Sequence, residues 1–165
     1  MFSGIEILDI AIRLEENGEK RYRNAAQLTG NPILINLLES MAEEEKKHGR
    51  FFSDLKKKIE IREDNHIIQE MSNALVKDIV GDQIFSLAET DFGKIEMVGE
   101  LIRIFIGFEN DTILFYEMLK SFITDDAVAG KLNEIISEEK KHIESFRKLA
   151  PSEKDSRYPV FGTAC

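Results

Sequence analysis

The chain has 165 residues, a net charge of −9, and 42% hydrophobic and 32% charged residues. This length suffices for one domain with a substantial core, and the negative charge argues against nucleic-acid backbones and anionic membrane surfaces as partners. The single cysteine, Cys165, excludes a disulfide framework and a cysteine-based metal site, and its free thiol fits the reducing cytoplasm where we expect the protein to reside.

Two helices are predicted in the first part of the chain. Apolar residues recur at helical spacing over about residues 3–28, and Glu15 lies on the same stripe. The second predicted helix covers about 32–61 and carries Glu45 and His48 on its apolar face. In the turn between them, Gly30 can adopt the left-handed conformation that ends a helix, and Asn31 can cap the next helix. The ring of Pro32 fixes a backbone angle suited to the first turn of that helix. Glu15 and Glu45 are equally distant from Gly30, so an antiparallel hairpin sets their carboxylates at one level.

Residues 62–93 separate this hairpin from the next. Their apolar residues predict a short amphipathic helix over about 67–79, and a connection this long can cross a bundle from end to end. His66 lies three residues after Glu63, but no matching carboxylate stands in a preceding helix. We therefore expect His66 to be an ordinary surface or packing histidine.

A second hairpin is predicted after this connection. Its first helix covers about 94–122 and carries Glu109 on the apolar face. Residues 124–126 form the turn and cap the last helix, which carries Glu139 and His142 and continues to about residue 149. No stretch is apolar for long enough to span a bilayer, so we expect no membrane as partner.

The two predicted hairpins are copies of each other. The run Glu-Glu-Lys-Lys-His occupies 44–48 and again 138–142, an offset of 94 residues (138 minus 44). The same offset relates further pairs, among them Glu15 and Glu109, Tyr22 and Tyr116, Leu38 and Leu132, and Phe52 and Phe146. The sequence thus predicts an all-α four-helix bundle over 1–150, made of two repeated helical hairpins with a long crossover over 62–93, and an irregular tail over 151–165.

The repeat gathers metal-ligating side chains. A Glu-x-x-His step places a carboxylate and an imidazole one helical turn apart on the same face, as a metal held between facing helices requires. Two divalent ions would balance four crowded carboxylates, and the oxygen and imidazole donors favour iron or manganese, with zinc less specific. The six candidate ligands are Glu15, Glu45, His48, Glu109, Glu139 and His142.

Roles within this set differ. Glu45 and Glu139 are the natural bridging ligands, because each shares a helix with a terminal histidine. Glu15 and Glu109 would be terminal or partly bridging, and the sequence leaves both open. Tyr22 and Tyr116 lie two turns beyond a ligand, where they would either hydrogen-bond a ligating carboxylate or only pack.

With these motifs the sequence resembles the rubrerythrin-like branch of the ferritin-like di-iron proteins. The resemblance covers the four long helices and is carried by Glu15 through Tyr22, Glu109 through Tyr116, and the two Glu-Glu-Lys-Lys-His runs. It implies a bundle with a non-haem centre of two iron ions that reacts with hydrogen peroxide or dioxygen, in a dimer or larger homo-oligomer.

Two departures from the family pattern stand out. Rubrerythrins proper carry a rubredoxin-like domain whose four cysteines bind an electron-transfer iron, whereas this sequence has only Cys165. They also carry an extra metal-binding glutamate one turn past the third-helix ligand, where this chain has Thr112; the matching position in the first hairpin is Gly18. We expect the electron donor to be separate, for example a rubredoxin-like protein.

Three functions are compatible with the sequence. The preferred hypothesis is a cytoplasmic oxidoreductase that reduces peroxide, or dioxygen, at the di-iron centre with electrons from an external donor, as part of a defence against oxidative stress. The second hypothesis is iron storage, in which the same site oxidises ferrous iron and passes it on. The third is a structural bundle that its metals only hold closed.

Overall fold

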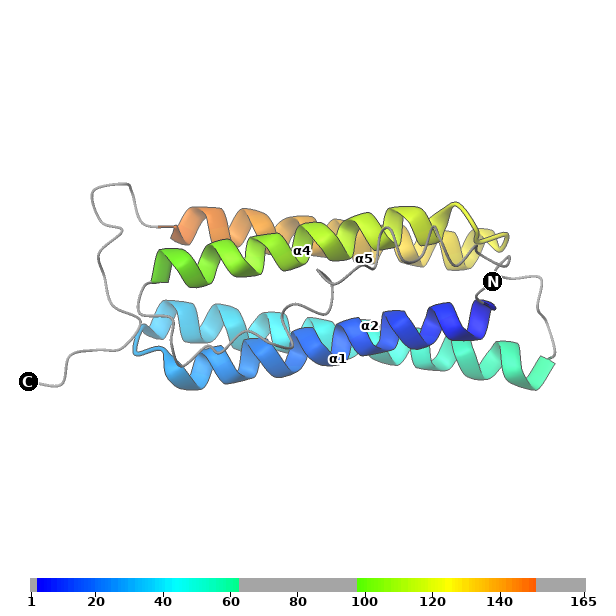
Figure 1. Cartoon of the computed structure of the whole chain (residues 1–165), viewed down its shortest axis with the longest axis horizontal. Helices are drawn as coiled ribbons and strands as arrows, with labels where there is room; N and C mark the ends of the chain where they lie inside the picture. The colour runs from blue at the N-terminus through cyan, green and yellow to red at the C-terminus, as the bar shows by residue number, and fades with distance from the viewer. Residues whose placement is uncertain (1–2, 63–97, 151–165) are drawn as a thin grey trace, which may run out of the picture.

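Four long helices lie side by side in two antiparallel pairs (Figure 1). The computed structural model describes residues 3–62 and 98–150. Its helices are α1 (Gly4–Leu28), α2 (Pro32–Arg62), α4 (Val98–Lys120) and α5 (Asp126–Leu149). Helix α1 packs mainly on α2, and α4 on α5. The predicted all-α fold of two helical hairpins is confirmed.

The order of the helices requires a long crossover. Helix α2 ends at one end of the bundle and α4 begins at the opposite end, so the connection between them joins opposite ends (Figure 1). The connection itself, with the predicted short helix and His66, lies outside the described residues, as does the tail over 151–165. None of the helices in the described ranges is both long and apolar enough to cross a membrane.

Side chains cap the helices where the sequence places capping residues. The hydroxyl of Ser3 accepts from the amide of Glu6 at 3.3 Å, and the amide of Ser3 donates to the Glu6 carboxylate at 2.8 Å, which completes a capping box. Asn31 accepts from the amide of Leu34 at 3.2 Å, and Asp125 from the amide of Val128 at 2.9 Å. Both predicted N-caps are thereby confirmed.

One helix end differs from the prediction by two residues. Helix α1 ends at Leu28 as predicted, and the backbone of Thr29, its C-cap, is extended. Helix α4 ends at Lys120 and not at Phe122. The amide of Phe122 still donates to the carbonyl of Leu119, the tighter spacing of a 3₁₀ turn, so the apolar periodicity continues past the last α-helical residue.

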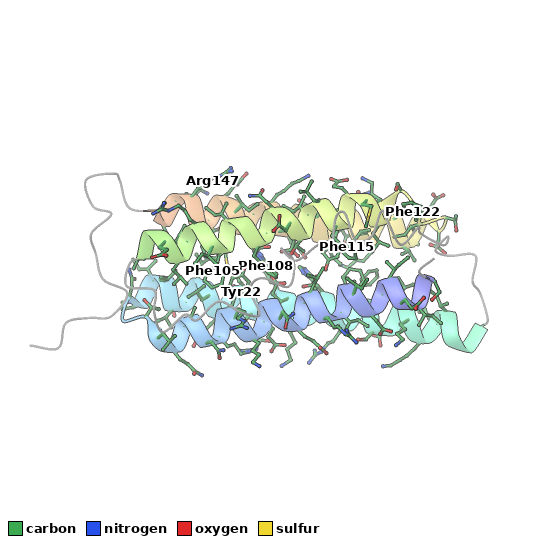
Figure 2. The ribbon with its side chains drawn as sticks, in the orientation of Figure 1. Tyr22, Phe105, Phe108, Phe115, Phe122 and Arg147 are labelled. Atoms are coloured by element: carbon green, nitrogen blue, oxygen red, sulfur yellow. The ribbon has the colours of Figure 1, made fainter. Side chains whose placement is uncertain are left out.

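Aromatic rings fill the space between the hairpins around the middle of the bundle (Figure 2). Toward one end, the rings of Tyr22 and Phe105 have centroids 4.7 Å apart, and Phe146 stacks on Phe105 at 5.5 Å. Toward the other end, Phe52 lies 5.2 Å from Tyr116. All five rings are at most 1% exposed. This packing leaves the layer between the two groups enclosed by apolar surface.

Candidate metal centre

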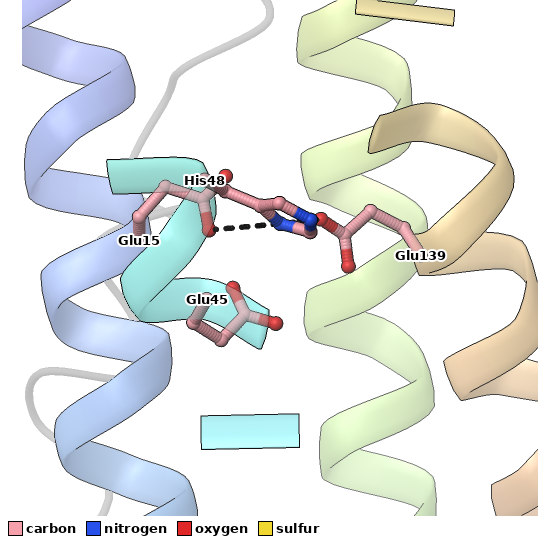
Figure 3. A group of neighbouring side chains, drawn as sticks. All are labelled: Glu15, Glu45, His48 and Glu139. Carbon is pink, nitrogen blue, oxygen red and sulfur yellow. Dashed lines mark ion pairs between the residues drawn. The ribbon is translucent and has the colours of Figure 1, made fainter. Parts of the chain in front are cut away.

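The six candidate ligands lie together in that enclosed layer. They form two overlapping groups, and within each group the nearest donor atoms all lie within 4.8 Å of one another. Figure 3 shows one group, with Glu15 from α1, Glu45 and His48 from α2, and Glu139 from α5. The other group is Glu45, Glu109, Glu139 and His142. Each of the six is at most 3% exposed. Glu45 and Glu139 belong to both groups, the position expected of bridging carboxylates.

The centre holds buried oxygen atoms that lack hydrogen-bond partners among the described residues. Both oxygens of Glu45, both of Glu139 and one each of Glu15 and Glu109 are in this state. Nδ1 of His48 lies 2.9 Å from Oε1 of Glu139, but neither atom makes an aligned hydrogen bond. Leaving buried polar atoms unpaired costs several kcal/mol each by rough estimate. Converging lone pairs of oxygen and imidazole nitrogen are a donor set suited to a divalent metal such as iron or manganese.

Charge repulsion inside the cluster shifts its proton affinities. Burial and the charge of Glu139 raise the pKa of Glu109 to about 8 and the pKa of Glu45 well above its usual value. Burial also acts to raise the pKa of Glu139, but contacts with both histidines outweigh it and hold that pKa at about 2. Burial lowers the histidine pKa values, but the carboxylates prevail and raise the pKa of His48 and of His142 to about 11. In the metal-free chain, protons therefore neutralise part of the negative charge of the carboxylates. Metal cations that bind there would displace these protons.

Each histidine is held from its outer side by a glutamate of the opposite hairpin. Nε2 of His48 lies 2.7 Å from Oε2 of Glu138, and Nε2 of His142 lies 2.6 Å from Oε2 of Glu44. Because an ionised carboxylate only accepts, Nε2 carries a proton and donates it to this outer glutamate, and Nδ1 faces the acidic cluster. Helical spacing alone predicts no role for Glu44 and Glu138, although their repetition at the same offset of 94 residues is a signal that could have found them.

Both tyrosines also reach across to the opposite hairpin. The hydroxyl of Tyr22, on α1, donates to Oε1 of Glu109 on α4, and the hydroxyl of Tyr116, on α4, donates to Oε1 of Glu15 on α1. Burial and the facing carboxylate raise the pKa of each tyrosine well above its usual value, so both keep the proton that they donate. The sequence left packing and hydrogen bonding equally open, and the structure contains the hydrogen bonds.

The two positions one turn beyond Glu15 and Glu109 are not equivalent. A Cβ atom added to Gly18 would lie 2.9 Å from Oε2 of Glu45, so glycine leaves room for that carboxylate. Thr112 takes the matching place on α4, is 1% exposed, and its hydroxyl has no hydrogen-bond partner among the described residues. Where the resemblance predicted an extra carboxylate, this chain has the small, neutral side chain of Thr112.

Comparisons with known proteins agree with this geometry. Residues 6–150 match the sequence profile of the rubrerythrin family. A solved structure, described as a ferritin-like diiron-carboxylate protein from Thermotoga maritima, superimposes with a TM-score of 0.66 at 22% sequence identity and covers 90% of this chain and 95% of its own. No curated protein matched. At that identity, the structural likeness shows the ferritin-like fold alone.

Proposed function

Because the chain belongs to the rubrerythrin family, we propose that it is a non-haem di-iron oxidoreductase that reduces hydrogen peroxide, or dioxygen, with electrons from an external donor. The observation that carries the proposal is the set of unpaired carboxylate oxygens facing two imidazoles inside an apolar bundle. That donor set, with four carboxylates and two histidines, fits two divalent ions.

The proposed ligands have distinct roles. His48 and His142 would each hold one metal through Nδ1, the nitrogen that faces the cluster. Glu45 and Glu139 would bridge, because both belong to each group of donors. When bound, two ferrous ions would supply the two electrons that, with two protons, convert hydrogen peroxide into two water molecules. The external donor would return those two electrons.

The surrounding residues of the chain prepare this site. Glu138 and Glu44 accept from Nε2 of the histidines, which fixes the tautomer and the plane of each ring. Tyr22 and Tyr116 donate to Glu109 and Glu15, and so leave the second oxygen of each carboxylate to face a metal. The aromatic rings on either side shield the layer from water along the bundle axis, and the low polarity there strengthens electrostatic interactions.

Electron supply and assembly form the rest of the proposal. The 165 residues contain one cysteine, too few for a four-cysteine iron site, so we assign the donor role to a separate carrier such as a rubredoxin-like protein. The family suggests a homodimer, which sedimentation analysis of the purified chain would test. Reduction of the oxidised centre by a purified rubredoxin-like protein, followed optically, tests the donor.

The first experiment is metal analysis of protein purified without chelator or added metal. We expect two iron ions per chain, or two after anaerobic reconstitution with ferrous iron. Stoichiometric peroxide should then oxidise the di-ferrous protein rapidly, with one peroxide consumed per two irons. Inertness toward both peroxide and dioxygen would refute the oxidoreductase, and uptake of iron well beyond two ions per chain would instead favour storage.

A pair of variants tests the proposed bridges. Replacing Glu45 or Glu139 by alanine should weaken binding of both metals, because each carboxylate contacts both groups of donors. Glu39, exposed on α2, provides the matched control, and Glu39→Ala should retain two metals. Loss of a single metal from Glu45→Ala would contradict the bridging role.

A further inference from the structure

A cavity of about 170 Å³ lies between α1 and α2 and reaches the acidic cluster. Its innermost lining residues are Glu15 and Glu45, both 1% exposed, whereas Glu16 and Arg50 at its rim are exposed. Since roughly 15 Å³ suffices for one water molecule, the cavity is large enough for several. The cavity therefore leads inward from the surface between α1 and α2 as far as the side chains of Glu15 and Glu45, whose unpaired oxygens are buried behind it.

The lining of this cavity is predominantly acidic. It contains four carboxylates, Glu15, Glu16, Glu19 and Glu45, and two basic side chains, Lys46 and Arg50. The pKa of Glu43 is lowered mainly by its hydrogen bond with Arg23. The positive charges of the two basic lining residues contribute to the same shift. The cavity thus offers net negative charge, which concentrates cations in a cleft with low-dielectric walls.

The carboxylates follow one another inward, and the innermost are unpaired. Glu16 is exposed, Glu19 is half-buried and forms an ion pair of 2.9 Å with Arg23, and Glu45 is buried. Both oxygens of Glu45 and Oε2 of Glu15 have no hydrogen-bond partner among the described residues. The lining thus presents carboxylate oxygens at increasing depth, from the exposed Glu16 to the buried Glu45.

The second hairpin differs at the equivalent positions. Gly49 lines the cavity, whereas the residue 94 positions later is Ile143, which is 5% exposed. Glu19 corresponds to Ile113 in the same way. The ligands keep the two-fold repeat, but the α4–α5 pair carries two bulky apolar side chains where the α1–α2 pair carries a glycine and a carboxylate.

We propose that the cavity between α1 and α2 is the route by which divalent metal ions reach the centre. Gly49 keeps the passage open, and Glu16 and Glu19 attract the ion and relay it to Glu15 and Glu45. The proposal rests on the proposed function only in taking Glu15 and Glu45 as metal ligands. It concerns the loading of the centre and is independent of any reaction with peroxide.

The test measures the rate at which the metal-free, full-length chain takes up Co²⁺, followed by the visible absorption of the bound ion. Gly49→Ile places in the passage the side chain that the second hairpin carries. We expect loading to slow by at least about tenfold, equivalent to ~1.4 kcal/mol of added barrier, with the final capacity unchanged. Gly107→Ile is the matched control, because a Cβ at this exposed helical glycine meets no atom within 4 Å. An unchanged loading rate in Gly49→Ile would overturn the proposal.

A Cβ added at Gly49 would lie 3.4 Å from Cβ of Glu15, so isoleucine at this position can displace that proposed ligand. A second variant therefore changes only the charge of the passage. In Glu16→Gln/Glu19→Gln the passage stays open but loses two negative charges. We expect Co²⁺ loading to slow several-fold at low salt and to depend less on ionic strength, with full capacity. Glu39→Gln, on α2 away from the cavity, should load like the parent chain. Parent-like loading and salt dependence in the double variant would refute the route.

Peroxide separates this inference from the proposed function. Loading is measured without oxidant, so slowed loading in a chain that is inert to peroxide would support the route and refute the oxidoreductase. If Gly49→Ile instead loads at the parent rate but is oxidised more slowly by peroxide, the passage serves the oxidant and the metal route is refuted.

Discussion

Nε2 of His48 lies 2.7 Å from Oε2 of Glu138, although the two residues belong to different hairpins and are 90 positions apart in the sequence. The repeat supplies the same contact a second time, between His142 and Glu44 at 2.6 Å. Each proposed metal-binding imidazole is therefore oriented by the half of the chain that does not carry it. The centre depends on the hairpins being docked together.

Replacing Glu138 by glutamine should weaken metal binding without unfolding the bundle. An amide cannot accept from Nε2–H with the strength of a carboxylate, so His48 loses orientation and basicity. We expect the affinity for one metal to fall about 10–100-fold, measured by competition with a chromophoric chelator. Glu134→Gln, an exposed change one turn earlier on α5, is the control. Equal affinity in both variants would contradict the role of Glu138.

Replacing Tyr116 by phenylalanine should destabilise the chain. The change removes a donor from the buried carboxylate of Glu15, and such losses cost about 1–3 kcal/mol. Tyr22→Phe should cost a similar amount, because Tyr22 makes the equivalent bond to Glu109. Urea unfolding of both metal-free variants measures the loss, and unchanged midpoints would show that the hydroxyl groups only fill space.

Metal binding should release protons and weaken as the pH falls. In the metal-free chain the pKa values of both histidines are about 11 and that of Glu109 is about 8, so these groups are protonated at pH 7. Coordination needs neutral imidazole and ionised carboxylate, so the metal-bound state holds fewer protons, and a higher pH favours it. Calorimetry of Co²⁺ binding in two buffers of different ionisation enthalpy counts the protons. Buffer-independent heats would contradict the assignment of these ligands.

Replacing Gly18 by alanine should weaken the binding of both metals. The added methyl would meet Oε2 of Glu45 at 2.9 Å and the ring of Phe108 at 3.2 Å, so the bridging carboxylate must move. Alanine alone favours the helix by about 1 kcal/mol. Gly107→Ala, with open space around its Cβ, isolates that gain and should keep parent-like metal affinity. Parent-like affinity in Gly18→Ala would refute the need for space at Glu45.

Replacing Thr112 by valine should stabilise the metal-free chain by about 1 kcal/mol, because the buried hydroxyl has no partner among the described residues. Thr29 provides the contrast: it is 5% exposed, but its hydroxyl accepts from the amide of Asn31 at 3.3 Å. Thr29→Val should therefore lose stability. Thermal unfolding compares the two variants, and a loss at Thr112 would show that its hydroxyl has a partner.

The fold could be predicted from the sequence because the repeat shows which helices form equivalent hairpins. The apolar pattern of a single helix does not show this. One offset of 94 residues paired the hairpins, and the turn at Gly30 set Glu15 level with Glu45. The same information brought the six candidate ligands together as the structure has them. The assignment of these residues to metal stays a prediction that the metal analysis will test.

Other features depend on tertiary contacts that spacing does not report. Glu138 is partly exposed, with 38% of its side chain accessible, so its charge resembles any solvated helix face until the opposite hairpin brings His48 to it. The hydrogen bonds of the tyrosines could not be told from packing for the same reason. Gly49 lines the cavity and faces Glu15 on α1, a pairing of helix faces that spacing does not report.

The cross-hairpin bonds also bear on how such a chain can change over evolutionary time. Two separate copies of one hairpin, related by a two-fold axis, would make the same paired contacts between tyrosine and carboxylate and between imidazole and carboxylate. In such a dimer any substitution appears twice. Within one polypeptide each half mutates alone, so Gly49 and Ile143 can coexist around a ligand set that remains symmetric. Covalent fusion thus allows one face of the centre to change while the ligand set keeps its two-fold repeat.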